Sequence, residues 1–376
     1  MGKADLLLVA GEASGDQHGA RLLAALQRLR GGDLQPFGLG GDELIGAGLD
    51  SVAHSSEVAV MGISEALKVL PRARAIYRLL LAEVERRRPE VAVLVDFAEF
   101  NMRLARDLSR RGVKVVYYVS PQVWAWRRGR VRTVADTVER MLVLLPFEVD
   151  FYRRHGVEVV HVGHPLVDEV PLLPQRWDRE EEPRPPYVVS LLPGSRPSEV
   201  SRLLPILLGA AKVLAREEAV ELRLIRAPGL PVADLERHLG SFPAPVEIVS
   251  ADRYREVADS HVALCASGTA ALETALLGTP TVVVYRVAWL SYLTGLLLVR
   301  LPFVSLVNLV LGRQAVAEML QGDATPEKVA RQALRLLRRP DRVRRMRTDF
   351  EELRRALGAP GASERAAREV HEVLEG

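Results

Sequence analysis

The sequence predicts an α/β protein of two domains, each with a parallel β-sheet flanked by helices. Short apolar runs of strand length alternate with amphipathic helical segments along most of the chain, which is the pattern of repeated βαβ units. With 376 residues, the chain exceeds the size at which a single hydrophobic core keeps growing. The pattern also restarts after a proline-rich, charged stretch at residues 172–186, which we interpret as the linker between the two domains.

The composition is that of an ordinary globular protein and argues against a nucleic acid partner. The net charge is only +3, and acidic and basic residues are interleaved along the chain. The single cysteine, Cys265, lies in an apolar run, so we expect it to pack in a core and the protein to work in the reducing cytosol. The longest uncharged apolar run, residues 287–299, is too short to span a membrane but long enough to lie on one.

The first domain opens with a predicted strand at residues 5–10, a polar loop and a helix from His18 onward. The loop carries Glu12, Ser14 and Asp16, and it follows the carboxyl end of the strand, where open α/β sheets bind ligands. Two interpretations stay open: the loop is a ligand site, or it is a tight turn in which Asp16 caps the helix. Capping does not explain Glu12, because a glutamate at a strand end gains no structural partner there.

A second group of acidic residues follows the apolar strand predicted at residues 91–95. Asp96 ends this strand and Glu99 lies three residues further on, again at the ligand edge of the sheet. We therefore expect a cluster of carboxylates together with the first loop. For Asp96 we favour catalysis over capping, and for Glu99 the two interpretations stay open.

Four further strands are predicted in this domain, at residues 35–39, 114–119, 140–145 and 158–162. The loop after residue 119 carries Trp124 and Trp126, which either form a wall for a sugar ring or pack under the loop. A helical segment at residues 58–81 is expected to break at Pro71, with arginines clustered after the break. It either contacts a lipid surface or packs inward.

The second domain contains two loops that are suited to bind a diphosphate. The strand predicted at residues 187–192 leads into Gly194, Ser195 and Arg196, where backbone donors at a helix N-terminus and a forked guanidinium favour an anion. The strand predicted at residues 261–265 leads into a second such loop, which has the sequence Ser267-Gly268-Thr269. Two anion-binding loops in one domain indicate a nucleotide diphosphate.

Two more residues of this domain are candidate ligands. Glu273, one turn into the helix after the second loop, either binds ribose hydroxyls or offsets the helix dipole. Asn308 lies in the apolar segment 303–313, where capping, a turn or ligand binding would each explain it. The strand at residues 281–285 separates the two.

Other cofactor classes lack their sequence signals. Neither loop is a Walker sequence, no Gly-x-Gly-x-x-Gly follows a strand, and no His-x-x-x-His or Cys-x-x-Cys pair occurs, at His164 or elsewhere. No aspartate has another aspartate two positions on. We therefore expect neither an organic cofactor nor a metal ion.

The chain ends in three predicted helices between residues 325 and 374, the second of them starting near Pro340. Arginines are concentrated between residues 331 and 347, with Asp341 as the single acid in that span. Such a charge run is either a solvated face or a surface that meets anionic headgroups.

A carboxylate-lined pocket in one domain and a diphosphate site in the other describe a glycosyltransferase that uses a sugar nucleotide. At this point the sequence resembles the lipid A disaccharide synthase family nearly end to end. The resemblance is carried, in order, by VAGEASGD (residues 9–16), AVMGISEAL (59–67), YVSPQVWAWRRGRV (118–131), LLPFE (144–148), VGHPL (162–166), LLPGSR (191–196), ASGTAALE (266–273) and FVSLVNLVLGR (303–313).

This resemblance implies a GT-B fold, in which two Rossmann-like domains face a central cleft. The first domain would span residues 1–171 and bind the acceptor, and the second would span residues 187–340 and bind the UDP-sugar. Residues 341–376 would form helices that cross back onto the first domain. The family also implies peripheral association with the cytoplasmic surface of the inner membrane, and a possible homodimer.

The resemblance further implies a reaction and the roles of individual residues. UDP-2,3-diacylglucosamine and 2,3-diacylglucosamine 1-phosphate (lipid X) would give the β-1,6-linked disaccharide 1-phosphate and UDP, with inversion and without a metal ion. Asp96 matches the general base of the family. The other residues matched to the site are Glu12, Ser14, Asp16, Glu99 and Asn101 for the acceptor, and Gly194, Ser195, Arg196, Ser267, Gly268, Thr269, Glu273 and Asn308 for UDP.

The chain departs from the usual family pattern in several places, among them the loop after Asp96, where a proline is missing and Ala98 stands. Glu99 replaces a shorter aspartate, and Gln122, Val307 and Gln314 replace serine, proline and glutamate. Asp96 and Asn101 are retained, so we expect the chemistry to be retained as well, whereas the acyl-chain pocket and the preferred acceptor are open. Two alternatives also stay open: a UDP-sugar epimerase of the same fold, and a non-catalytic lipid- or nucleotide-binding relative.

Overall fold

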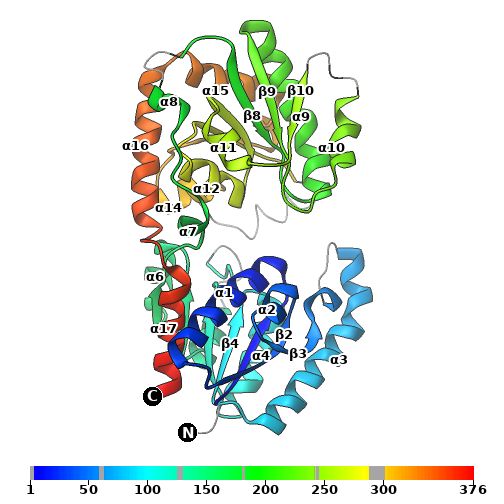
Figure 1. Cartoon of the computed structure of the whole chain (residues 1–376), viewed down its shortest axis with the longest axis vertical. Helices are drawn as coiled ribbons and strands as arrows, with labels where there is room; N and C mark the ends of the chain where they lie inside the picture. Colours follow the sequence, from blue (N-terminus) through cyan, green and yellow to red (C-terminus); the bar gives the residue numbers. More distant parts are fainter. Residues whose placement is uncertain are drawn as a thin grey trace. The chain divides into compact units, whose positions relative to one another are not determined.

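The computed structural model describes residues 4–58, 63–124, 130–179, 183–240, 242, 245–287 and 301–376, and the chain folds into two compact units (Figure 1). Unit 1 contains Met1–Pro165 and Gly358–Gly376, and unit 2 contains Leu166–Leu357. Each unit has a parallel β-sheet with helices, so the predicted fold class is confirmed.

A seven-stranded sheet forms the centre of unit 1, in the order β3-β2-β1-β4-β5-β6-β7 with every pairing parallel. All the predicted strands of this domain are present. The sequence did not predict β3, because its residues are mostly polar or small and form no apolar run. The strands are β1 (Ala4–Ala10), β2 (Leu34–Gly40), β3 (Asp50–His54), β4 (Val91–Val95), β5 (Lys114–Tyr118), β6 (Arg140–Val143) and β7 (Val159–His161).

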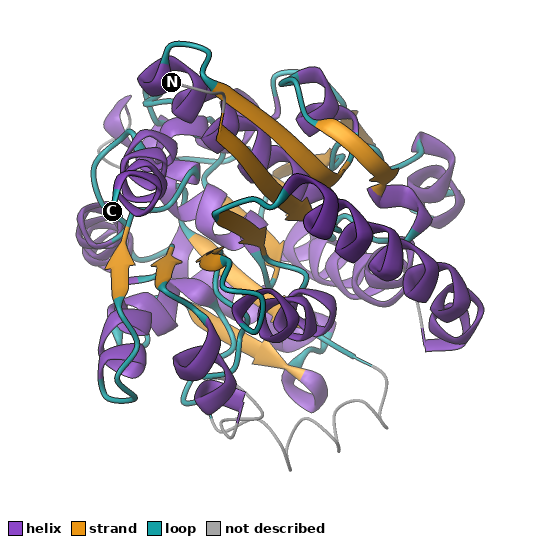
Figure 2. Cartoon of the chain, turned by 90° about the horizontal axis from the view of Figure 1, so that it is seen from below, coloured by secondary structure: helices purple, strands orange, loops and turns teal. Residues whose placement is uncertain are grey.

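Helices lie on both sides of the strands (Figure 2). The first of them begins at Ala13, earlier than the predicted start at His18. The expected break at Pro71 is wrong, since α3 continues through this proline, which removes only one internal backbone hydrogen bond. The helices of unit 1 are α1 (Ala13–Arg30), α2 (Asp42–Gly46), the 3₁₀ turn η1 (Ser55–Glu57), α3 (Ile63–Arg87), α4 (Ala98–Ser109), α5 (Val131–Thr137), α6 (Pro146–Arg153) and α17 (Ala362–Glu375).

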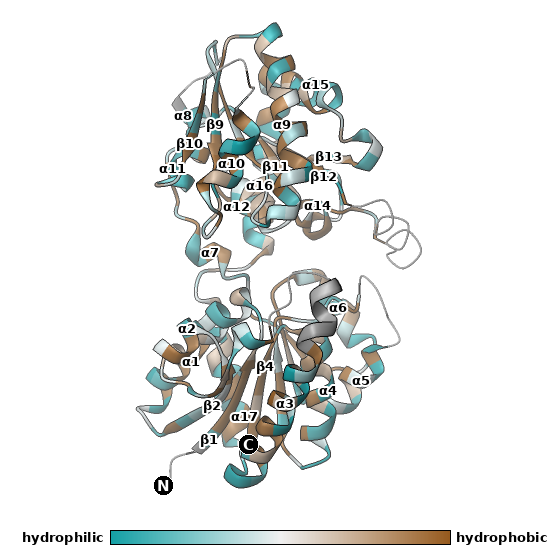
Figure 3. Ribbon diagram, turned by 90° about the vertical axis from the view of Figure 1, so that its right-hand side faces the viewer, coloured by the Kyte–Doolittle hydropathy of each residue, from teal (hydrophilic) through white to brown (hydrophobic). Residues whose placement is uncertain are grey.

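Successive residues of β1 divide between two hydrophobic cores, one on each face of the sheet. Leu6 and Leu8 pack with residues of α1 and α17, whereas Leu7 and Val9 pack with residues of α3 and α4. The central strands β1 and β4 are largely hydrophobic, while the helices are hydrophilic on their outer faces (Figure 3). Burial on both faces explains why β1 is a continuous apolar run rather than an alternating one.

Unit 2 is built on a six-stranded parallel sheet in the order β10-β9-β8-β11-β12-β13. The predicted strands correspond to β8, β11 and β12, and Cys265 in β11 is fully buried as expected. The others were not predicted because charged residues interrupt them. The strands are β8 (Tyr187–Leu192), β9 (Val220–Ile225), β10 (Val246–Val249), β11 (Val262–Ala266), β12 (Thr281–Tyr285) and β13 (Ala317–Leu320).

The three C-terminal helices are present, and the second begins at Pro340 as predicted. Several arginines of this region form ion pairs within unit 2: Arg338 with Glu217 and Glu218, and Arg347 with Asp178. The helices of unit 2 are α7 (Leu166–Glu169), α8 (Arg176–Arg179), α9 (Pro197–Glu217), α10 (Val232–Leu239), α11 (Arg253–Ala258), α12 (Thr269–Leu276), α14 (Leu306–Leu311), the 3₁₀ turn η3 (Gln321–Asp323), α15 (Pro326–Leu337) and α16 (Pro340–Ala356).

The chain passes from unit 1 to unit 2 after Pro165 and returns to unit 1 at Gly358, and both boundaries differ from the expected ones. The first unit ends at Pro165 rather than at residue 171. Of the segment 341–376, only α17 packs with unit 1, where it lies against α1, whereas α16 packs with α12, α14 and α15 of unit 2. The expected return of the chain is therefore limited to residues 358–376.

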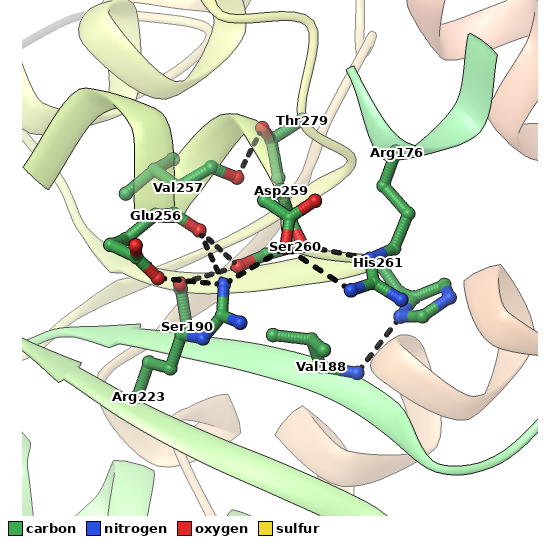
Figure 4. Close-up of polar contacts among 10 residues, drawn as sticks. All are labelled: Arg176, Val188, Ser190, Arg223, Glu256, Val257, Asp259, Ser260, His261 and Thr279. Carbon is green, nitrogen blue, oxygen red and sulfur yellow. Dashed lines mark hydrogen bonds and ion pairs between the residues drawn. The ribbon is translucent and has the colours of Figure 1, made fainter. Parts of the chain in front are cut away.

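Most of the predicted linker is attached to unit 2. Arg176 donates to the carbonyl of Asp259 at 2.9 Å and pairs with its carboxylate at 3.1 Å, and Trp177 donates to the carbonyl of His261 at 3.0 Å. Arg223 reaches the same carboxylate from β9 at 3.3 Å (Figure 4). Proline and charge predicted an exposed linker here, but these contacts make residues 176–177 part of the unit.

Each sheet has one place where the direction of strand succession reverses. In unit 1 this place lies between β1 and β4, and in unit 2 it lies between β8 and β11. In open α/β sheets, such a reversal point at the carboxyl ends of the strands is where ligands usually bind. The four candidate loops of the sequence analysis follow these four strands.

Among the described residues, we find no helix that combines the length and the apolar character needed to cross a membrane.

Candidate active site

In unit 1, the loops after β1 and β4 meet at the reversal point of the sheet. Ala10 and Val95, the last residues of the two strands, are partners in the parallel ladder. A Cβ atom added to Gly11 would lie 2.3 Å from the ring of Phe97, so only glycine lets the second loop approach the first. Glu12 and Asp96 are thereby brought together, as the predicted carboxylate cluster requires.

The turn that carries Asp96 has an unusual backbone. Asp96 and Phe97 are consecutive non-glycine residues in the left-handed region, with φ of 47° and 49°. Such conformations cost about 1–3 kcal/mol each and are found mainly where a site requires them. This geometry ends β4 and starts α4, whose N-cap is Phe97. Strain of this kind supports a functional role for Asp96.

Electrostatics at Asp96 suit a group that accepts a proton. Burial, together with the negative charge of Glu12, raises the pKa of the Asp96 carboxyl to about 6, although the backbone N–H of Phe97 opposes the shift. The side chain is half-buried, while Glu12 is exposed. A carboxylate with this pKa is ionised at neutral pH but holds a proton more strongly than an ordinary aspartate does.

The remaining acidic residue of the second loop is paired. Glu99 forms a two-point ion pair with Arg130, at 2.6 and 2.9 Å. The pair borders a small pocket that is also lined by Ala98, Met102 and Gln122. Glu99 and Gln122, which both depart from the family pattern, thus line the same pocket next to the turn that carries Asp96.

Two residues predicted to bind the acceptor make buried hydrogen bonds within the protein. The buried carboxylate of Asp16 accepts from the N–H groups of Gly41, Glu43 and Leu44 at 2.6, 3.0 and 3.3 Å, so it caps α2. Asp16 therefore caps a helix, but this helix is α2 and not its own helix α1, as the capping interpretation had it. Asn101 has no exposed surface, and its amide donates to the carbonyls of Val95 and Asp96. Ser14 is exposed in the first turn of α1.

Trp124 packs under its loop rather than forming a sugar wall. It is 6% exposed, its ring meets Phe147 edge to face, and its Nε1 donates to Glu148 at 2.8 Å. Burial raises the pKa of Glu148 to about 7. Trp126 lies outside the described residues.

In unit 2, the loop after β8 already holds a carboxylate. Glu199, in the first turn of α9, accepts from the N–H groups of Ser195 and Arg196 at 3.2 and 3.3 Å. Gly194 has φ of 105°, and a Cβ atom there would lie 2.6 Å from Glu199. The sequence analysis missed this residue, although its position three residues after the N-cap is the spacing of a capping box.

Arg196 keeps its side chain in solvent. It is 74% exposed and lies 3.6 Å from the Glu199 carboxylate, a long and weak ion pair. Its guanidinium is therefore available to an anionic ligand, whereas the two backbone donors of the loop would first have to release Glu199.

The loop after β11 begins α12, with Gly268 as N-cap at φ of 141° and Thr269 exposed beside it. Glu273 is fixed by its neighbours rather than by the helix alone: its Oε1 accepts from Arg253 at 3.1 Å and from Tyr254 at 2.8 Å. Among the described residues, none donates a hydrogen bond to Oε2. One carboxylate oxygen thus remains for a ligand.

Asn308 has a structural role, which is one of the alternatives left open for it. It has no exposed surface and all its hydrogen-bonding groups are used: Oδ1 accepts from Ala315 and Val316, and Nδ2 donates to Val316 and Glu318. Glu318 in turn accepts from the N–H of Val304, whose carbonyl accepts from Ser267 at 3.4 Å. Asn308 therefore helps to position Val304, which contacts Ser267 of the second loop, through Glu318.

Replacing Asn308 by alanine should destabilise the protein by about 2–5 kcal/mol, because several buried backbone groups and Glu318 would lose their partners. Thermal or urea unfolding measures this change. The exposed Gln314 provides the control, since Gln314→Ala should change stability by no more than about 0.5 kcal/mol. Equal unfolding midpoints for the two variants would contradict the structural role.

No group of three or more histidine, cysteine, aspartate or glutamate side chains suited to hold a metal ion occurs among the described residues.

The chain has the GT-B fold, in which each of two units is Rossmann-like. Over 99% of its length it matches the structure of a "glycotransferase of kitacinnamycin" (TM-score 0.65, 17% identity, 99% of that chain). It also matches a UDP-GlcNAc 2-epimerase from Neisseria meningitidis solved with bound UDP-GlcNAc (TM-score 0.62, 11% identity, 99% of this chain and 100% of that one). At such identities these matches show the fold alone.

The chain belongs to the lipid-A-disaccharide synthase family. The family model described as "Lipid-A-disaccharide synthetase" matches residues 6–373. A lipid-A-disaccharide synthase from Myxococcus xanthus is 44% identical over 376 residues, covering 98% of this chain and 97% of the relative. The predicted resemblance is thus confirmed.

Proposed function

We propose that the chain joins UDP-2,3-diacylglucosamine to 2,3-diacylglucosamine 1-phosphate and forms the β-1,6-linked disaccharide 1-phosphate and UDP. The observation that supports this most is the half-buried Asp96, with a pKa of about 6, at the reversal point of the unit 1 sheet. Family membership supports the substrates and disfavours the epimerase.

In this reaction, Asp96 takes the proton from the 6-hydroxyl of the acceptor. The hydroxyl oxygen attacks C1 of the donor sugar from the face opposite UDP, and the electron pair of the breaking C1–O bond leaves with UDP, so the configuration at C1 inverts. Glu12 stabilises the protonated form of Asp96 by its negative charge, and Glu99 with Arg130 borders the acceptor side.

Unit 2 holds the nucleotide in this proposal. Arg196 and the N-terminal ends of α9 and α12 stabilise the negative charge that develops on the diphosphate. Glu273 offers its Oε2 to the ribose hydroxyls. Because Glu199 occupies the Ser195 and Arg196 donors, it would have to turn away as the diphosphate binds.

We further propose that the enzyme works at the cytoplasmic surface of the inner membrane, where its acylated substrates reside. A homodimer remains a prediction from the family.

Activity should persist in excess EDTA, because Arg196 and the helix N-termini replace the charge of a metal ion on the leaving diphosphate. Initial rates are compared with and without chelator on detergent-dispersed substrate, so that divalent ions do not act through lipid packing. A loss beyond about tenfold that magnesium or manganese restores would instead make the carboxylates of the site metal ligands.

Mass spectrometry of the products after incubation with both diacylated substrates tests the proposed function. The disaccharide 1-phosphate and UDP are expected, in equal amounts and only when both substrates are present. Conversion of the UDP-sugar without acceptor would indicate an epimerase, and unchanged substrates would indicate a binding protein. Either of these two results would reject the proposal.

A further inference from the structure

The strained turn at Asp96 has no glycine to relieve it, so other contacts must hold it. The N–H of Asp96 donates to the carbonyl of Tyr118 at 3.0 Å, which ties the turn to β5. The ring of Phe97 lies over Gly11 and stacks on Phe100, with ring centroids 5.1 Å apart. These contacts fix the two residues on either side of the Asp96 carbonyl.

That carbonyl is itself held by two buried side chains. The hydroxyl of Tyr117 donates to it at 2.7 Å, and Nδ2 of Asn101 donates to it at 2.9 Å. Tyr117 and Asn101 are both 0% exposed, so neither can contact a substrate directly. Tyr117 comes from β5, which pairs with β4 on the side away from β1, and Asn101 comes from α4, which begins at the turn.

The side-chain amide of Asn101 is oriented so that its nitrogen donates hydrogen bonds while its buried oxygen accepts none. Its Nδ2 faces the carbonyls of Val95 and Asp96, at 3.1 and 2.9 Å, and that of Val9 at 3.5 Å, whereas the buried Oδ1 has no hydrogen-bond partner among the residues that the structure describes. An orphaned buried acceptor is unfavourable and rare. A side chain chosen for stability alone would satisfy both ends, so the orientation indicates a demand for a donor at this turn.

We infer that Tyr117 and Asn101 are positioning residues for the reaction: by holding the carbonyl of Asp96, they keep the strained turn in the one conformation that directs its carboxylate toward the acceptor. The inference rests on the proposed role of Asp96 as general base. Because both act through the backbone, the carboxylate can be aimed without any side chain blocking access to it.

The test is Tyr117→Phe, which removes one hydroxyl and leaves the ring in the core. Its matched control is Tyr152→Phe, which removes an equally buried hydroxyl that pairs with Ser120 at 2.7 Å and does not touch Asp96. We expect Tyr117→Phe to lower kcat about tenfold or more relative to the control, as misplacement of a reacting group does. The KM for the UDP-sugar and the melting temperature should match the control, and Asn101→Ala should lower kcat in the same direction.

A double-mutant cycle separates this inference from the proposed function. In an Asp96→Asn background, Tyr117→Phe should lower kcat by less than about twofold, because residues that act as a unit are not additive. A tenfold further loss in that background, or a kcat equal to the control in the single variant, would overturn the positioning role. A near-normal rate in Asp96→Asn alone would instead reject Asp96 as the base.

Discussion

Replacing Asp96 by asparagine should lower the rate of disaccharide formation by roughly 10²–10⁴, the usual contribution of a general base. Asparagine keeps the shape of the side chain and tolerates the left-handed backbone, but it cannot accept the proton of the acceptor hydroxyl. Affinity for UDP, measured by calorimetry, should be nearly unchanged, because the candidate UDP residues lie in unit 2. Near-normal turnover would reject the assignment.

Stability provides the control for misfolding in this variant. Since burial raises the pKa of Asp96 in the folded chain, the folded state binds the proton more tightly than the unfolded state does, and stability is lost as pH rises from about 4 to about 6. Asparagine carries no such penalty, so Asp96→Asn should be at least as stable as the parent near pH 8.

Glu99→Gln, which breaks an exposed ion pair, should have a milder effect on rate.

Replacing Arg196 by alanine should weaken UDP binding by about 1.5–3 kcal/mol, or about 10- to 150-fold, if its guanidinium forms a charged hydrogen bond with the diphosphate. The side chain is exposed and only weakly paired with Glu199, so folding should not depend on it. Arg202→Ala is the matched control, because it removes the same charge from an exposed position further along α9. Equal affinities for UDP in the two variants, measured by calorimetry, would remove Arg196 from the site.

The fold was largely predictable because its central strands are buried on both faces. Strands such as β1 and β4 therefore appear as continuous apolar runs, whereas β3, β10 and β13 at the sheet edges and the internal strand β9 carry polar or charged residues, so they were missed. The course of α3 through Pro71 could not be predicted either, since a helix tolerates one lost hydrogen bond where tertiary packing supports it.

The location of candidate site residues was predictable where they lie in a loop just after a central strand. Glu12, Asp96 and Arg196 come directly after the central strands, and topology alone brings them to the ligand edges. Asp16 and Asn308 could not be assigned, because their partners are backbone groups supplied by folding, such as the N–H groups of α2 for Asp16. Tyr117 gave no signal, since inside a strand it is indistinguishable from a core tyrosine.

The pH dependence of kcat/KM for the acceptor, measured from about pH 4.5 to about pH 9, tests the central claim that Asp96 removes the proton of the acceptor. With a pKa of about 6, the carboxyl becomes protonated as the pH falls and can no longer act as a base. The rate should therefore be constant at high pH and fall about tenfold per unit below about pH 6, and the residual activity of Asp96→Asn should lack this limb. A wild-type rate that stays constant down to about pH 5 would contradict the account.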